Sequence, residues 1–150
     1  DLMAHFSTTI DSALPAEAAF GLLADFSSVA QWDPGVTAAV RLDEGPLRVG
    51  SAFLVTATFG PRRIPLTYVI RALDPGHRVV LDAVTADFVS HDVITVEPGP
   101  VGSRVTYDAT LTLQGGRRVA DPLLQAAFAV IGRRAEAGLR SALNPQAVAA

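Results

Sequence analysis

Hydrophobic and polar residues alternate over most of the chain, and a period of two residues is typical of β-strands with one buried face. Breaks rich in Gly and Pro, such as Gly45-Pro46 and Asp74-Pro75-Gly76, separate the alternating stretches. Helical spacing replaces alternation in residues 14–26 and 28–32, and again in a long segment that begins at Asp121. The predicted strands, seven in all, cover residues 4–10, 36–42, 51–59, 64–73, 78–84, 88–96 and 104–113.

The helical segments carry start and stop signals. Pro15 lies near the first turn of the first segment, Ser27 can cap the second, and Asp33-Pro34-Gly35 ends it. Asp121-Pro122 combines an N-cap with Pro at the first helical position. A sheet with one apolar face must be covered, and the long helix is the only large element available, so we expect one α+β domain over residues 1–150. The apolar stripe of that helix consists of Leu124, Phe128, Ile131, Ala135, Leu139 and Leu143.

Strand parity predicts which side chains face the interior, because residues opposed across a hairpin share a face. Four-residue loops at 60–63 and 74–77 and a two-residue turn at 85–86 give one consistent inner face. In the adjacent pair His91-Asp92, the histidine then points outward and the aspartate inward. The inner face contains Phe53, Val55, Ala57, Phe59, Leu66, Tyr68, Ile70, Val79, Leu81, Ala83, Phe88, Ser90, Asp92, Ile94, Val96, Val105, Tyr107, Ala109, Leu111 and Leu113.

Composition narrows the possible functions. A chain of 150 residues with 49% hydrophobic residues is long enough to bury a core around a cavity. A net charge of −3 without a basic stripe argues against nucleic acid, and no apolar run approaches the ~20 residues that span a bilayer. The chain contains no Cys, no Lys and no paired metal-ligand spacing, so we expect no metal site and no cofactor. A cytoplasmic location is expected.

The few inward polar groups could carry chemistry. An ionised Asp92 among apolar residues is costly unless it is hydrogen-bonded or solvated. In the expected register the residues opposite Asp92 are Val79 and Ala109, whose side chains cannot form a hydrogen bond. Asp92 must therefore reach a tyrosine, Ser90, water or a ligand. Two interpretations stay open: a structural aspartate tied to a hydroxyl group, or an acid–base group. For Trp32 the alternatives are a plug that fastens the short helix to the sheet and a side chain that lines a pocket mouth.

Two arginine pairs are expected at one end of the sheet, because alternate hairpin loops of a meander lie at the same end. They are Arg62-Arg63 and Arg117-Arg118, beside the start of the long helix. Together they could frame an entrance that attracts an anionic ligand or partner, or they could be ordinary solvated charges.

The order of elements, with the stretches "FSSVAQWDPGV", "VGSAFLV", "HDVITVEPGPVGSRVTYDATLTL" and "DPLLQAAFAVIGRRAEAGLRSAL", resembles the START-like (SRPBCC) superfamily. Within it, the chain is similar to the bacterial polyketide cyclase/dehydrase and lipid-transport-like group, from Phe6 to Leu143. The resemblance implies a helix-grip fold: a curved seven-stranded antiparallel sheet around a long C-terminal helix, with two short helices after the first strand and a cavity inside. That fold serves carriers, hormone receptors, cyclases and chaperone activators.

The resemblance also implies roles for particular residues. Cyclases of the family hold a polyketide chain while Tyr, Ser, Asp and Arg side chains steer enolisation and dehydration. The candidates for catalysis here are Asp92, Tyr68 and Tyr107, although no strand carries an inward Arg. The candidates for ligand binding, from parity and the implied cavity, are Trp32, Phe53, Val55, Leu81, Ser90, Leu111, Phe128 and Ile131.

Three functions are compatible with these residues and with the resemblance. The leading one is binding of a hydrophobic small molecule, a lipid or polyketide-like compound, by a monomer or homodimer. The second is an aromatase/cyclase or dehydratase in the same cavity, with an acyl carrier protein as a possible partner. The third is a protein-interaction module, which should expose an apolar patch; the outward Thr and Asp side chains of residues 104–113 argue against that.

Overall fold

The computed structural model describes residues 3–114 and 121–145, so Arg117 and Arg118 lie outside the described residues. The strands pair antiparallel in the order β1-β7-β6-β5-β4-β3-β2, which confirms the α+β, helix-grip architecture. The elements are β1 (Met3–Ser12), α1 (Ala16–Ala24), the 3-10 turn η1 (Phe26–Ser28), α2 (Val29–Trp32), β2 (Val36–Arg41), β3 (Ala52–Phe59), β4 (Arg62–Asp74), β5 (Arg78–Val84), β6 (Phe88–Pro98), β7 (Ser103–Leu113) and α3 (Asp121–Leu143).

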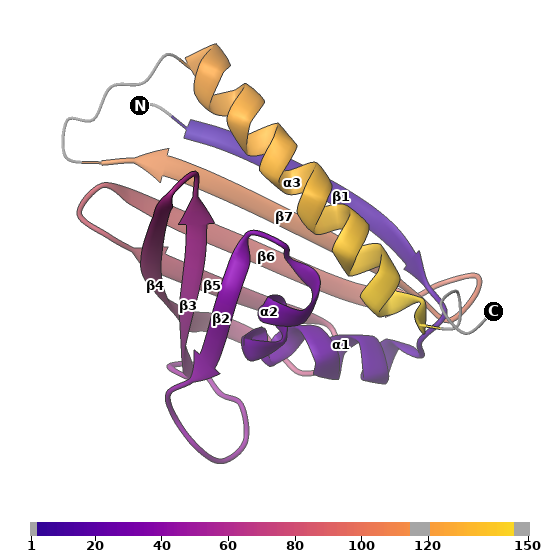
Figure 1. Cartoon of the computed structure of the whole chain (residues 1–150). Coiled ribbons are helices and arrows are strands. Elements are labelled where there is room, and N and C mark those ends of the chain that lie inside the picture. Colours follow the sequence, from indigo (N-terminus) through magenta and orange to yellow (C-terminus); the bar gives the residue numbers. More distant parts are fainter. Residues whose placement is uncertain (1–2, 115–120, 146–150) are drawn as a thin grey trace.

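The helices cover the curved sheet unequally. In Figure 1, α3 runs lengthwise beside β1, and α1 and α2 lie near its C-terminal end. The C-terminal half of α3 is packed into the core, where Leu139 is 2% and Leu143 is 0% exposed. Farther toward its N-terminus, Phe128 and Ile131 of the same apolar stripe are only half-buried. A solid core therefore fills one end of the molecule, and α3 packs less closely at the other.

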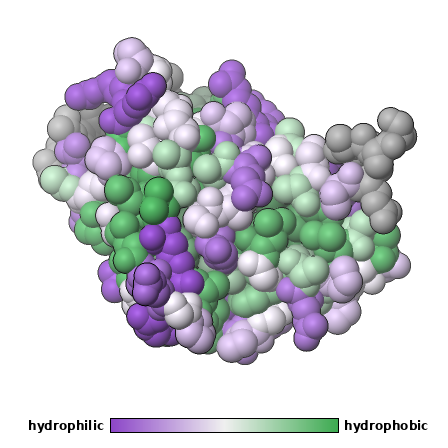
Figure 2. Space-filling view, turned by 60° about the horizontal axis from the view of Figure 1, so that its bottom comes forward, coloured by the Kyte–Doolittle hydropathy of each residue, from purple (hydrophilic) through white to green (hydrophobic). Residues whose placement is uncertain are grey.

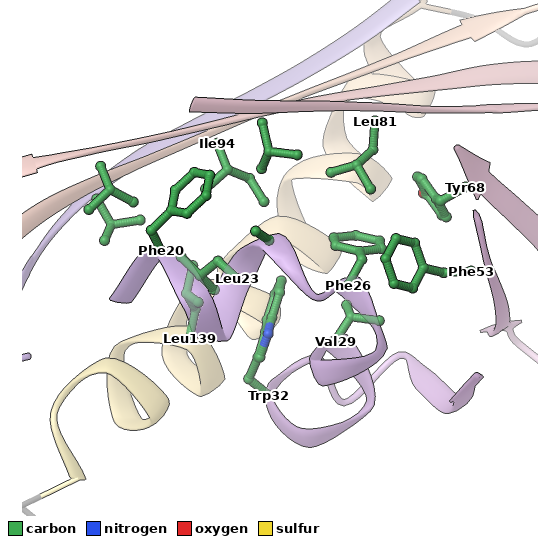
Figure 3. Packing of buried hydrophobic residues seen from close by; sticks show 14 of the residues in the cluster. Phe20, Leu23, Phe26, Val29, Trp32, Phe53, Tyr68, Leu81, Ile94 and Leu139 are labelled. Carbon is green, nitrogen blue, oxygen red and sulfur yellow. The ribbon is translucent and has the colours of Figure 1, made fainter. Parts of the chain in front are cut away.

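The solid core is built around η1 and α2. Figure 3 shows the ring of Phe26 beside those of Phe53 and Tyr68, with Leu81 above them on the sheet. The ring centroids of Phe26 and Tyr68 lie 4.9 Å apart, and those of Phe26 and Phe53 lie 6.4 Å apart with the planes at 68°. The turn that carries Phe26 is capped by Asp25, whose Oδ1 accepts from the Ser27 amide at 3.2 Å. Ser27 is therefore not the cap that the sequence indicated.

The inner face agrees with the parity prediction, although all three turns differ in length from the prediction, two of them by two residues. Phe59 pairs with Arg62 across a two-residue turn, and Val84 pairs with Val89 across a four-residue turn. Each register differs from the expected one by two residues, which leaves the strand residues on their predicted faces. The residue opposite Asp92 on β5 is consequently Leu81 rather than Val79.

The hairpin between β4 and β5 keeps its parity by a different route. Asp74 pairs with Arg78, so the loop has three residues instead of four. An odd loop would turn β5 over, but a bulge between Ile70 and Ala72 inserts one extra residue into β4. Ile70 therefore still faces the same side as its partner Leu81, and both are fully buried.

Two glycines allow α3 to approach its neighbours. A Cβ at Gly138 would lie 1.7 Å from the carbonyl oxygen of Trp32, and one at Gly132 would lie 2.4 Å from the ring of Phe6. The end of the helix is held as well, because Ser12 Oγ donates to the Leu143 carbonyl at 2.7 Å. These contacts fix the distance between α3, α2 and β1.

Large hydrophobic side chains also reach the surface. On the face seen in Figure 2, hydrophobic residues gather in two patches with hydrophilic residues between them. Four exposed hydrophobic residues belong to the edge strand β2, its partner β3 and the intervening segment: Val40, Leu42, Val49 and Leu54. On β7 the outward Thr106, Asp108 and Thr110 are polar, as expected. The other exposed large hydrophobic residues among those described are dispersed over different elements: Met3, Val84, Val101 and Val130.

Gly138→Ala should destabilise the protein, because the added Cβ overlaps the Trp32 carbonyl and overpacking costs about 1–3 kcal/mol. The matched control is Gly21→Ala in α1, where nothing lies within 4 Å of the added Cβ. That change should stabilise the protein by up to about 1 kcal/mol, since Ala has the higher helix propensity. Urea unfolding measures both variants. Equal effects of the two substitutions would contradict the close approach at Gly138.

Candidate functional site

A cavity of about 540 Å³ lies between the sheet and α3, as the resemblance implied. This volume falls within the ~300–1,000 Å³ typical of small-molecule sites. The cavity occupies the region where α3 is only half-buried, beside the solid core. Its wall includes Thr8, Val36, Val55, Ala57, Thr58, Leu66, Ala109, Ala135 and Leu139, besides the residues discussed below.

One end of the cavity is apolar. Phe6 of β1, Phe88 of β6 and Leu111 of β7 form its sheet side. Phe128 and Ile131, on the N-terminal half of α3, form its helix side. Leu111, Phe128 and Ile131 were predicted as ligand contacts from parity and the apolar stripe, and each lines the cavity. This end offers a surface for an aliphatic or aromatic group.

A hydrogen-bonded network of four polar side chains lies in the sheet wall of the cavity. Ser90 and Asp92 lie two residues apart on β6 and therefore face the same side. Tyr107 Oη donates to Asp92 Oδ2, and Ser90 Oγ donates to Asp92 Oδ1 at 3.3 Å. Tyr68 Oη lies 2.8 Å from Ser90 Oγ and donates to it, since the single Ser90 hydrogen goes to Asp92. The expectation that Asp92 points inward and reaches a tyrosine, Ser90, water or a ligand is confirmed, because it accepts hydrogen bonds from Tyr107 and Ser90.

Burial sets the protonation behaviour of this network. Desolvation raises the pKa of Asp92 to about 6, against the lowering effect of the hydrogen bonds from Tyr107 and Ser90. Burial and the nearby Asp92 charge raise the pKa of both Tyr68 and Tyr107 well above the ordinary tyrosine value. Near neutral pH the two phenols are therefore hydrogen-bond donors, and Asp92 titrates close to the physiological range.

A second carboxylate, Asp33, belongs to the cavity and was missed as a site residue. It follows α2, and its Oδ1 accepts from the Gly35 amide at 2.8 Å while burial raises its pKa. From the sequence Asp33 was interpreted only as a helix stop, although its position directly after the single tryptophan was a usable signal. Trp32 itself is 5% exposed, and its ring meets that of Tyr107 edge-on at 5.7 Å. Trp32 thus both fastens α2 and lines the cavity.

Helix α3 adds two charged residues that sequence reasoning also missed. Glu136 accepts from Thr8 Oγ1 at 2.7 Å and from Arg140 at 3.1 Å, and it lines the cavity. Arg134 is exposed and lines the same cavity. Both flank the apolar stripe, and a stripe alone does not tell which flank faces a cavity. An arginine therefore lines the cavity from the helix, whereas no strand of the described residues supplies one to its wall.

Some predicted site residues lie elsewhere. Phe53 and Leu81 are 0% exposed in the solid core and do not line the cavity, so the expectation that they form part of its lining was wrong. Parity placed them on the correct face but could not separate core from cavity. Arg62 and Arg63 are exposed at the start of β4 and do not line the cavity, although Gly60 beside them does; their role at an entrance stays a prediction.

His91 lies on the outer face of the sheet, as predicted. Its Nδ1 is 2.5 Å from Asp82 Oδ1 on the neighbouring strand β5, away from the cavity.

Within residues 3–114 and 121–145, no group of three His, Asp or Glu side chains is placed to hold a metal ion. In the same residues, no helix combines the length and the apolar character that crossing a membrane requires.

Comparison with known proteins connects this geometry to a family. Residues 3–143 match the family described as polyketide cyclase / dehydrase and lipid transport. A sequence search found no match among curated proteins. The fold resembles the Zhui aromatase/cyclase from Streptomyces sp. R1128, with a TM-score of 0.73 and 13% identity over 94% of this chain and 91% of that one.

Two further solved structures share the fold. The di-domain ARO/CYC StfQ from the steffimycin biosynthetic pathway has a TM-score of 0.71 and 15% identity, covering 99% of this chain and 53% of that one. The present chain therefore spans about half the length of StfQ. Ara h 8.0201 has a TM-score of 0.61 and 17% identity over 93% of this chain and 99% of that one.

Asp92→Asn should remove a pH-dependent loss of stability. The pKa of Asp92 is about 6 in the folded protein against a reference value of 3.8, so the unfolded chain ionises first. The folded protein loses stability as the pH rises through this window, by about 3 kcal/mol, and the loss persists at higher pH. Urea unfolding from pH 3 to 8 measures the free energy of unfolding of both proteins. As the pH rises, this free energy should fall for the wild type relative to the Asn variant.

Tyr107→Phe tests the raised pKa of Asp92 through its hydrogen-bond donor. It removes a hydrogen bond that lowers the pKa of Asp92, so the stability loss should extend to higher pH. A difference between wild type and Asp92→Asn that stays constant from pH 3 to 8 would contradict the raised pKa.

Proposed function

The chain belongs to the polyketide cyclase/dehydrase and lipid transport family, and on this premise we propose that it binds a hydrophobic small molecule, a lipid or polyketide-like compound, in the cavity between α3 and the sheet. The observation that carries the proposal is the 540 Å³ cavity with an apolar end formed by Phe6, Phe88, Leu111 and Phe128. A cavity of this kind provides what a carrier needs, which is enclosed volume and apolar surface.

The affinity should follow the length of the ligand. Each methylene group moved from water into the apolar end contributes about 0.8 kcal/mol, which corresponds to a roughly fourfold gain in affinity. The gain should stop when the cavity is full. Trp32 is the single tryptophan and lines the cavity, so its fluorescence reports occupancy without a label.

Ala109→Phe should fill part of the cavity and weaken binding of a C12 fatty alcohol at least tenfold. The control is Thr110→Phe, because adjacent strand residues face opposite sides and Thr110 lies on the outer face, opposite His91. Binding is measured by Trp32 fluorescence and calorimetry, and native mass spectrometry of freshly purified protein tests for a retained ligand. Absence of binding to any alcohol from C8 to C16 would overturn the proposed function.

A second candidate is an acid–base enzyme acting on a polyketide-like chain in the same cavity. The observation in its favour is the carboxyl group of Asp92, whose pKa of about 6 suits proton transfer near neutral pH. Ionised Asp92 would take a proton from a carbon between two carbonyl groups, and the electron pair would move onto a carbonyl oxygen as an enolate. Tyr68 or Tyr107 would donate a hydrogen bond to that oxygen, and protonated Asp92 would return the proton.

The substrate of such an enzyme could reach the cavity free or attached to an acyl carrier protein. This partner, a cytoplasmic location and a monomeric or dimeric state remain predictions from the sequence.

Asp92→Asn separates the two candidates. With a long-chain 1,3-diketone in D2O, wild-type protein should accelerate exchange of the protons between the carbonyl groups, followed by NMR. The Asn variant should bind the diketone comparably, yet lose the acceleration, since an amide does not exchange a proton in this way. If wild type binds the diketone without accelerating exchange, the enzyme candidate is wrong and the carrier stands.

A further inference from the structure

The cavity meets the surface beside α2. A groove of about 490 Å³ runs between α2 and α3, past Gln31, Gly138 and Ser141. Trp32, Asp33, Pro34, Val36 and Arg134 line both the groove and the cavity. This shared wall lies at the α2–α3 side of the cavity, whereas Phe88, Leu111 and Phe128 form its apolar end. Because Arg134 is exposed and lines the cavity, the lining of the cavity reaches the surface at this shared wall, which is called the opening below.

Charged side chains at this opening differ in their partners. Asp33 accepts a hydrogen bond from the Gly35 amide. Glu136 lines the cavity but not the groove, and it accepts hydrogen bonds from Thr8 and Arg140. Arg134 makes no ion pair or hydrogen bond with another residue in the part of the chain that the structure describes. Its guanidinium group has five N–H donors. The opening therefore presents one cationic group with its binding capacity unused.

Arg134 and the apolar end of the cavity are separated along α3. Arg134 follows Phe128 by six residues on α3, which corresponds to about 9 Å along the helix. A molecule that placed its apolar body against Phe128 and Ile131 would bring its end group to Arg134. Asp33 lies at the same opening, where its Oδ1 accepts from the Gly35 amide at 2.8 Å and burial raises the pKa of its carboxyl group.

We propose that Arg134 binds the anionic end group, a carboxylate or phosphate, of an amphiphile whose apolar body occupies the cavity. The planar guanidinium group suits both anions, because it can offer two parallel N–H donors to two oxygens. The inference rests on the proposed function, since it names the class of ligand for the same cavity. It assigns the anion-binding role to the α2–α3 side, whereas the hypothesis from the sequence was an entrance framed by Arg62, Arg63, Arg117 and Arg118 at one end of the sheet.

Three probes with the same C12 chain test this inference: dodecanoate, dodecyl phosphate and dodecan-1-ol. They are titrated by calorimetry into wild type, Arg134→Gln and the control Arg133→Gln. Arg133 is the exposed neighbour of Arg134 on α3 and lines neither the cavity nor the groove. The informative quantity is the affinity of each anion relative to that of the alcohol, because the alcohol measures the contribution of the apolar chain alone.

Arg134→Gln should lower the affinity for at least one anion relative to the alcohol about tenfold, whereas Arg133→Gln should leave the ratio unchanged. The loss should shrink at high salt, which already screens the wild-type attraction. Arg134→Lys keeps the charge without the fork of donors and should give an intermediate ratio. Comparison of dodecanoate with dodecyl phosphate identifies which anion the site prefers.

Two results would overturn the inference, and they are distinguishable. If all proteins bind the alcohol and show the same anion-to-alcohol ratios, Arg134 has no role in anion binding and the proposed hydrophobic site stands. If no protein binds any of the three probes, the proposed function fails together with the inference.

Discussion

The packing of the C-terminal half of α3 determines where the molecule is solid and where it is hollow. At Gly138 the helix approaches the Trp32 carbonyl so closely that no side chain fits, and beyond it Leu139 and Leu143 are buried in the core. The same straight element cannot stay equally close to a curved sheet along its whole length. The space left beneath its N-terminal half is the cavity, so one backbone contact at the far end of the helix controls the size of the ligand site.

The polar network in the wall of the cavity lowers the stability of the fold, whereas the packing of α3 raises it. Asp92 is buried beside apolar strands, and the hydrogen bonds from Tyr107 and Ser90 offset only part of the cost of removing its charge from water. A purely structural role does not require a carboxylate at this position, since an apolar residue would avoid that cost. Asp92, together with the two protonated phenols of Tyr68 and Tyr107, gives a largely apolar cavity one polar wall at which a ligand can be oriented.

Much of the fold could be predicted from the sequence because parity is insensitive to some errors. The turns after Phe59 and Val84 had the wrong predicted lengths, yet errors of two residues left the inner face unchanged. The site was less accessible to prediction. Parity identifies a face, not depth, so Phe53 and Leu81 could not be separated from true cavity residues such as Val55. Arg134 was missed because its place in the cavity wall depends on how α3 approaches α2 and the sheet, which no local pattern encodes. Asp33 was missed because it was interpreted only as the end of a helix.

The bulge in β4 limits how the length of this chain can vary. Side chains alternate between interior and exterior, so adding or deleting two residues in a hairpin turn preserves the chemistry of the cavity. A change of one residue exchanges the two faces of every following position in the strand, unless a second irregularity compensates for it. The three-residue loop after Asp74 and the extra residue at Arg71 form such a compensated pair. Deleting Arg71 alone would therefore exchange the buried and the exposed positions that follow it in the sheet, although the sequence of those positions stays the same.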